Sequence, residues 1–251
     1  MKTTFLKEAM TSSTSEAFLD EPNHHEVQEP RRGVPQHQKM ITAEEMKRGI
    51  YIDFEGIPTR SPSLMGVLCQ GKMKQIVFDE DLISTTAGNP NLSFEGFSEA
   101  LLDLQRQALR EGRCLIAFSQ HESNLALEFG GVDISLLYKD ARFIAKRWRN
   151  RILRLNDTSI RSLKDYANLI GLNYPEGMIG MAARSLQNIK KSIGEHENFQ
   201  NCPMETKMCW SRLLHYNRLD CIWMREVVRA SVEIDSLRKL AASKKVQRSL
   251  H

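Results

Sequence analysis

Two carboxylates stand two positions apart in the segment Ile52-Asp53-Phe54-Glu55-Gly56. Successive side chains of a β-strand point to opposite faces, so Asp53 and Glu55 would share one face if this segment is a strand. Oxygen ligands in such a pair suit hard divalent cations such as Mg²⁺ or Mn²⁺. Ile52 and Phe54 would point the other way and anchor the strand in a core. The spacing therefore predicts a metal-binding strand here, and the alternative is two solvated acids near the end of an exposed strand.

Two more acids occur later in the chain, each beside a distinctive neighbour. Glu122 follows an apolar run and stands where a helix is expected to begin. Asp220 lies four residues after Tyr216 in a long helical segment, and that spacing puts both on one face. A group that orients water beside a metal carboxylate is what metal-assisted hydrolysis requires. His215 is the alternative to Tyr216, but adjacent helical residues diverge by about 100°, so the spacing of four favours Tyr216.

The elements that would position these acids begin with strands. Apolar and β-branched runs separated by turn residues predict three hairpin-connected strands at 50–58, 63–70 and 73–80. A fourth, buried strand is expected at 113–120, parallel to the first and followed by a helix at 121–129. Thr42 and Glu45 have the spacing of a capping box, which predicts a short helix that Gly49 ends. Ser93 is expected to cap a helix that Gly112 closes.

The second half of the chain is predicted to be mainly helical, with segments at 133–153, 159–172, 178–194 and 206–245. Strands followed by helices predict an α/β fold, a mixed sheet whose first three strands are antiparallel and whose later strands are parallel, flanked by helices. Composition divides the chain into a flexible leader at 1–40, a folded domain at 41–240 and a basic tail at 241–251 that frays.

The overall composition is that of a compact protein rather than a membrane or disulfide-rich one. The 251 residues are 41% hydrophobic, and no run approaches the roughly 20 apolar residues of a membrane span. The five cysteines form no CxxC pair, and the N-terminus lacks the apolar block of a secretory signal. We therefore expect a cytoplasmic protein. The net charge of +4 is too small to identify an anionic partner.

A basic cluster around a tryptophan is the sequence's candidate for contact with nucleic acid. Such a cluster could grip phosphates while the aromatic ring stacks on a base. The alternative is a solvated helix face with the tryptophan packed inward. The residues are Lys146, Arg147, Trp148, Arg149 and Arg151.

The order and context of the acids resemble the DEDD (DnaQ-like) superfamily of 3'-5' exonucleases, over roughly residues 49 to 235. The fragments that carry the resemblance are IDFEG, FSQHE and HYNRLD, in that order. It implies a ribonuclease H-like fold in which two Mg²⁺ or Mn²⁺ ions are held by Asp53, Glu55, Glu122 and Asp220. Asp53 would bridge the ions, and Tyr216 or His215 would orient the attacking water. Glu122 stands where the family usually has Asp, which is similar to the divergent branch with YprB-like ribonuclease H domains.

The function that the resemblance implies is metal-dependent hydrolysis of nucleic-acid phosphodiester bonds, as a 3'-5' exonuclease with a two-metal mechanism. A structure-specific endonuclease is one alternative, and a nucleic-acid-binding module of the same fold with weakened catalysis is another. A third is a globular interaction protein whose acids never approach one another. The sequence leaves DNA versus RNA, strandedness and oligomeric state open.

Overall fold

The computed structural model describes residues 40–151, 159–173 and 180–249, and side chains are described up to residue 233 except that of Arg151. Within this part of the chain, six strands form one mixed sheet in the order β4-β3-β2-β1-β5-β6. They are β1 (Ile50–Glu55), β2 (Leu64–Cys69), β3 (Lys72–Val77), β4 (Leu92–Phe94), β5 (Leu115–Ala117) and β6 (Tyr138–Asp140). The predicted leader and residues 152–158 lie outside the described residues.

The strand directions match the predicted α/β architecture. β1, β2 and β3 form an antiparallel meander, β5 runs parallel to β1, and β6 runs parallel to β5. β4 adds a parallel strand at the other edge, beside β3. A mixed sheet that begins antiparallel, continues parallel and is flanked by helices is consistent with a ribonuclease H-like arrangement.

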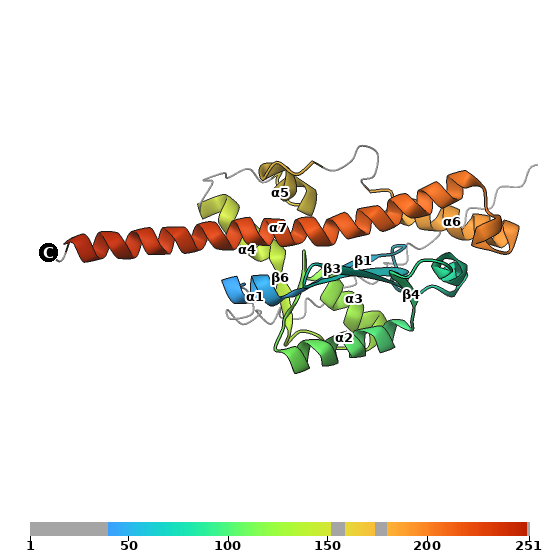
Figure 1. Cartoon of the computed structure of the whole chain (residues 1–251), viewed down its shortest axis with the longest axis horizontal. Coiled ribbons are helices and arrows are strands. Elements are labelled where there is room, and N and C mark those ends of the chain that lie inside the picture. The colour runs from blue at the N-terminus through green and yellow to red at the C-terminus, as the bar shows by residue number, and fades with distance from the viewer. Residues whose placement is uncertain (1–39, 152–158, 174–179, 250–251) are drawn as a thin grey trace, which may run out of the picture. The chain divides into compact units, whose positions relative to one another are not determined.

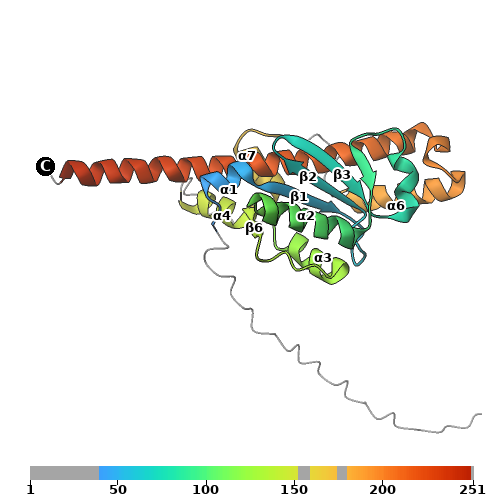
Figure 2. The same ribbon diagram turned by 60° about the horizontal axis from the view of Figure 1, so that its bottom comes forward.

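Helices cover both faces of the sheet (Figure 1). On one face lie α2 (Phe97–Glu111) and α3 (His121–Gly130), which come forward in Figure 2 while α7 lies behind the sheet. The helices of the other face are α4 (Ala141–Arg151), α5 (Leu163–Leu169), α6 (Ala182–His196) and α7 (Met204–Ser249). The remaining elements are α1 (Ala43–Arg48) and the short 3-10 helices η2 (Glu80–Thr86) and η3 (Phe199–Asn201).

The alternation of side chains along β1 decides which layer the acids face. Ile50 and Ile52 pack with the side chains of α2 and α3, and Phe54 joins that core. Tyr51 points the other way, into the core formed with α4, α5 and α7. Because side chains alternate along a strand, Asp53 and Glu55 lie on the Tyr51 side and face α7. The predicted orientation of Ile52 and Phe54 away from the acids is confirmed.

The acids also lie where β1 extends beyond its parallel neighbour. β5 pairs with β1 only at Ile50 and Tyr51 and ends at Ala117. The chain then turns into α3, so among the strands of the described residues only β2 pairs with the C-terminal half of β1. This leaves space beside Asp53 and Glu55 for side chains from α3 and α7.

Two local predictions are wrong, and in both a distant partner strand overrides the local pattern. Ser93 does not cap α2: it lies within β4, paired with Ile76 of β3, and the N-cap of α2 is Gly96. The helix predicted from residue 133 begins only at Ala141, because the preceding residues form β6 against β5. Short strands of this kind depend on tertiary pairing rather than on local propensity.

Two other local features can be compared directly with their predictions. The capping box is confirmed, since Glu45 N–H donates to Thr42 Oγ1 at 3.1 Å and Thr42 N–H donates to Glu45 Oε2 at 2.8 Å. The C-terminal helix was expected to fray near Leu240, whereas α7 is helical without a break to Ser249. Among the described residues, no helix combines the length and apolarity needed to cross a membrane.

Candidate metal centre

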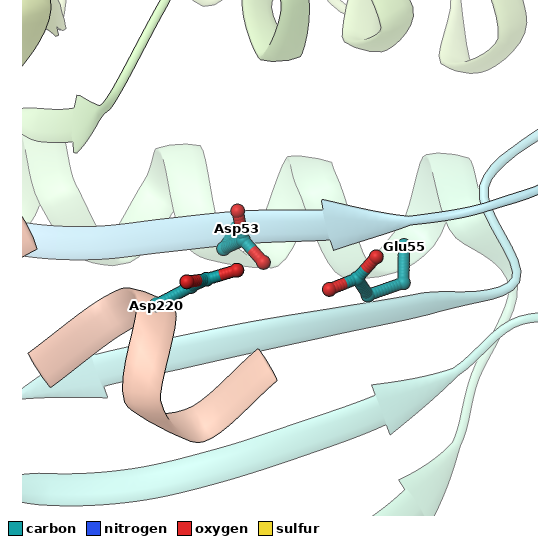
Figure 3. Close-up of side chains that lie close together, drawn as sticks. All are labelled: Asp53, Glu55 and Asp220. Atoms are coloured by element: carbon teal, nitrogen blue, oxygen red, sulfur yellow. The ribbon is translucent and has the colours of Figure 1, made fainter. Parts of the chain in front are cut away.

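Three carboxylates from two elements meet between the sheet and α7. Asp53 and Glu55 extend from β1, and Asp220 approaches them from α7 (Figure 3). One oxygen from each lies within 4.8 Å of the others. Carboxylate oxygens this close repel one another unless a cation or a proton lies between them. The three form a set of hard oxygen ligands of the type that Mg²⁺ and Mn²⁺ prefer.

Burial makes the negative charges of these carboxylates unfavourable in free energy when no cation is bound. Glu55 is 8% exposed and Asp220 is 7% exposed. Burial, together with the charges of Asp220, Glu55 and Glu122, raises the pKa of Asp53 well above its ordinary value. Burial, with the charges of Asp220 and Glu122, raises the pKa of Glu55 to about 8. Glu55 Oε1 is buried without a hydrogen-bond partner among the described residues. A bound cation would pair with this oxygen and offset the cost of burying it.

Glu122 lies beside the three converging acids rather than within their group. It is in the first turn of α3, where its Oε2 accepts hydrogen bonds from Ser119 Oγ at 3.2 Å and from Tyr138 Oη at 3.4 Å. Burial raises its pKa to about 7. Its charge still acts on Asp53 and Glu55. Of the four predicted ligands, the structure therefore brings three together and places Glu122 next to them.

Tyr216 and His215 differ in their position relative to the acidic group. Tyr216 is half-buried and is hydrogen-bonded to Asp220. Burial and the charges of Asp220, Glu55 and Asp53 raise the pKa of the Tyr216 hydroxyl far above its ordinary value, so it stays protonated and can donate a hydrogen bond. His215 is exposed on α7 and is not part of the acidic group.

A buried asparagine, missed from the sequence, positions Asp53. Asp53, Gly66 and Gln75 lie opposite one another across β1, β2 and β3. Asn217 of α7 donates from Nδ2 to Asp53 Oδ2 at 2.9 Å and to the Asp53 carbonyl at 3.2 Å, while its Oδ1 accepts from Gln75 Nε2 at 2.9 Å. The fully buried Asn217 therefore orients Asp53. Its position next to Tyr216, three residues before Asp220, was the only sequence signal.

The absence of a side chain at Gly66 makes room for Asn217, so a larger residue at this position should destabilise the fold. A Cβ on Gly66 would lie 2.4 Å from Asn217 Oδ1 and 2.9 Å from Met73 Cε. We expect Gly66→Ala to lower the free energy of unfolding by about 1–3 kcal/mol, the usual cost of overpacking. Chemical denaturation measures the change. The matched control is Gly194→Ala in α6, where a Cβ meets nothing within 4 Å. This substitution should raise the free energy of unfolding by about 0.5–1 kcal/mol, because alanine is a better helix former than glycine. A Gly66→Ala protein as stable as the wild type would contradict the packing.

The predicted basic cluster is divided between the core and the surface. Trp148 is buried against α7, so the inward-packing alternative is confirmed and its ring is not available to a base. Arg149 is also buried, and Arg147 is half-buried with Nη1 3.4 Å from Met40 Sδ. Lys146 alone of the described members is exposed. The helix places this tryptophan inward because it shares a face with Ile144 and Ala145, which pack into the same core.

The chain matches no model of a known protein family, and no curated protein sequence is significantly similar to it. The fold and the geometry of the acidic group are therefore the features from which a function can be inferred.

Proposed function

We propose that this protein is a metal-dependent nuclease that hydrolyses phosphodiester bonds of nucleic acids, acting as a 3'-5' exonuclease. The observation that carries the proposal is the convergence of Asp53, Glu55 and Asp220 within 4.8 Å. The buried, unpartnered Glu55 Oε1 supports it, because such an atom fits a cation ligand. The exonucleolytic polarity comes from the sequence resemblance alone.

Each residue of the site has a separate role in the proposed reaction. Asp53, Glu55 and Asp220 hold Mg²⁺ or Mn²⁺, and Glu122 completes the ligand set from α3. When bound, two such ions lower the pKa of water and neutralise charge on the phosphoryl group. Asn217 holds one oxygen of Asp53 so that the other remains available. The Tyr216 hydroxyl, kept protonated, orients the attacking water beside Asp220.

The proposal is tested by incubating the purified protein with end-labelled DNA and RNA, each single- and double-stranded. We expect digestion in Mn²⁺ or Mg²⁺ that stops when EDTA is added, with shortening from the 3' end. Asp53→Asn protein purified in the same way separates the activity from contamination. Binding without digestion would instead support the weakened binding module, for which the position of Glu122 outside the close group is the structural argument.

The Tyr216 role gives a prediction that also distinguishes it from His215. We expect Tyr216→Phe to lower the rate of hydrolysis by about 100-fold, because the hydroxyl that orients the water is removed. His215→Gln should leave the rate unchanged, since His215 is exposed and outside the acidic group. Single-turnover digestion of a labelled oligonucleotide measures both. A larger loss in His215→Gln than in Tyr216→Phe would reverse the assignment.

A further inference from the structure

A cavity of about 460 Å³ lies between α4 and the segment that leads into α5. Its volume is within the range of about 300–1,000 Å³ typical of pockets that bind small ligands. The side chains that give it chemical character are four cations and two aromatic rings: Arg142, Phe143, Lys146, Arg149, Arg161 and Tyr166. Such a lining favours an anionic ligand that also has a flat apolar surface.

The cavity is a neighbour of the acidic group. Tyr166, in its wall, packs against Phe118 with ring centroids 5.8 Å apart. Phe118 directly precedes Ser119, whose hydroxyl donates to Glu122. Asp140, which also lines the cavity, is close enough for its charge to raise the pKa of Glu122. A ligand in the cavity would therefore lie on the Glu122 side of the acidic group.

Arg149 is the strongest sign that the cavity binds an anion. It is only 6% exposed. Its Nε donates to Asn150 Oδ1 at 2.8 Å and its Nη1 donates to the Ile160 carbonyl at 2.5 Å. Among the described residues, Nη2 has no acceptor and Arg149 forms no salt bridge. Nη2 is not among the buried atoms that lack a partner, so it remains accessible. Because Arg149 lines the cavity, an anion held there could accept a charge-assisted hydrogen bond from it.

Among the described residues, the acid in the wall forms no salt bridge with Arg149. Asp140 Oδ1 accepts from the backbone N–H groups of Arg142 at 2.8 Å and Phe143 at 3.3 Å, and so caps the start of α4. Arg142 and Lys146, four residues apart on α4, are both exposed at the cavity, and Phe143 is 38% exposed there. Four cations against one carboxylate make the lining net positive, and the Phe143 ring is accessible to a ligand.

We propose that this cavity binds one unpaired nucleotide of a single-stranded nucleic acid on the Glu122 side of the acidic group. Arg149 contacts the phosphate from inside the cavity, with Arg142 and Lys146 at its rim. Phe143 stacks on the base, a contact that a base paired within a duplex does not offer. The inference rests on the proposed nuclease function and adds the strandedness of the substrate and the place where it is held.

The test measures binding of a fluorescein-labelled 12-nucleotide strand by anisotropy in EDTA, so that no strand is cut. DNA and RNA versions distinguish the sugar, and each is also tested as a duplex. We expect Arg142→Ala/Lys146→Ala to weaken single-strand binding about tenfold and to reduce the salt slope by about 1.4, the value for two phosphate contacts. The matched control is Arg106→Ala/Arg110→Ala, which removes two exposed cations at the same spacing on α2.

Phe143→Ala tests the stacking contact separately, and we expect about a tenfold loss of affinity at an unchanged salt slope. Its control is Leu109→Ala, an exposed apolar residue of α2. Equal affinities for all variants, or duplex binding as tight as single-strand binding, would overturn the inference. If the wild type still digests nucleic acid in Mn²⁺, the proposed function survives that result. A wild type that neither binds nor digests nucleic acid would overturn both.

Discussion

Asp53→Asn is expected to lower the rate of nucleic-acid hydrolysis by about 1,000-fold or more. The substitution removes the charge of one of the three converging acids, which interacts electrostatically with both Asp220 and Glu55. Metal ions supply several kcal/mol of transition-state stabilisation, and about 4 kcal/mol corresponds to a thousandfold change in rate. The measurement is single-turnover digestion of an end-labelled strand at saturating Mn²⁺.

The variant should lose activity without losing its fold. An asparagine keeps one acceptor oxygen for Asn217 Nδ2, which binds Asp53 Oδ2 at 2.9 Å. It also removes one of the mutually repelling charges, so the thermal midpoint without metal should not fall. The matched control is Asp103→Asn, an exposed acid on α2, which should retain full activity. Digestion by Asp53→Asn at the wild-type rate would eliminate Asp53 as a metal ligand.

Thermal stability in EDTA is expected to fall as the pH rises from about 5 to 8, and added Mn²⁺ should partly reverse the fall. The folded-state pKa of Glu55 is about 8 and that of Glu122 about 7, both above the ordinary value of 4.5. Between these values the folded protein binds more protons than the unfolded chain, so the free energy of unfolding decreases with pH. Below pH 4.5 both states are protonated and the effect vanishes.

The expected fall in the thermal midpoint follows from the pKa shifts of Glu55 and Glu122. One unit of pKa shift corresponds to about 1.4 kcal/mol, so the two buried acids together amount to several kcal/mol. At roughly 2–4 °C per kcal/mol for a chain of this size, the midpoint should fall by more than about 10 °C. Mn²⁺ at 100 times its dissociation constant contributes about 2.7 kcal/mol, and its effect should be larger at pH 8 than at pH 5, because only ionised carboxylates are ligands.

Glu55→Gln is the control for this titration. A glutamine has nearly the same shape but no charge, so the fall in midpoint between pH 5 and 8 should become shallower. Scanning fluorimetry of both proteins, with EDTA and with Mn²⁺, measures all four curves. Identical pH slopes in the two proteins, or an equal Mn²⁺ effect at pH 5 and pH 8, would show that Glu55 does not titrate in a metal site.

Several features of the site could be read from the sequence because they depend on local periodicity. The two-residue period of a strand puts Asp53 and Glu55 on one face whatever the strand packs against. The helical period likewise puts Tyr216 and Asp220 on one face. The α/β class and the antiparallel order of the first three strands followed from runs and turns that are also local.

Other features needed partners that are distant in the chain. Ser93 and the residues before Ala141 became strand because β3 and β5 offered them hydrogen bonds. Trp148 is buried because α4 packs on α7. Local pattern is compatible with more than one such outcome, and the free energy of pairing or burial selects one.

The sequence by itself determined which acids share a face within each element, since backbone geometry sets that relation residue by residue. Tertiary structure alone decided that the face of β1 with Asp53 meets the face of α7 with Asp220, and that Glu122 stands beside them. It also placed Asn217 over Gly66, a contact that depends on the register of β1, β2 and β3. The contacts between β1 and α7 join residues more than 150 positions apart, and no local pattern encodes them.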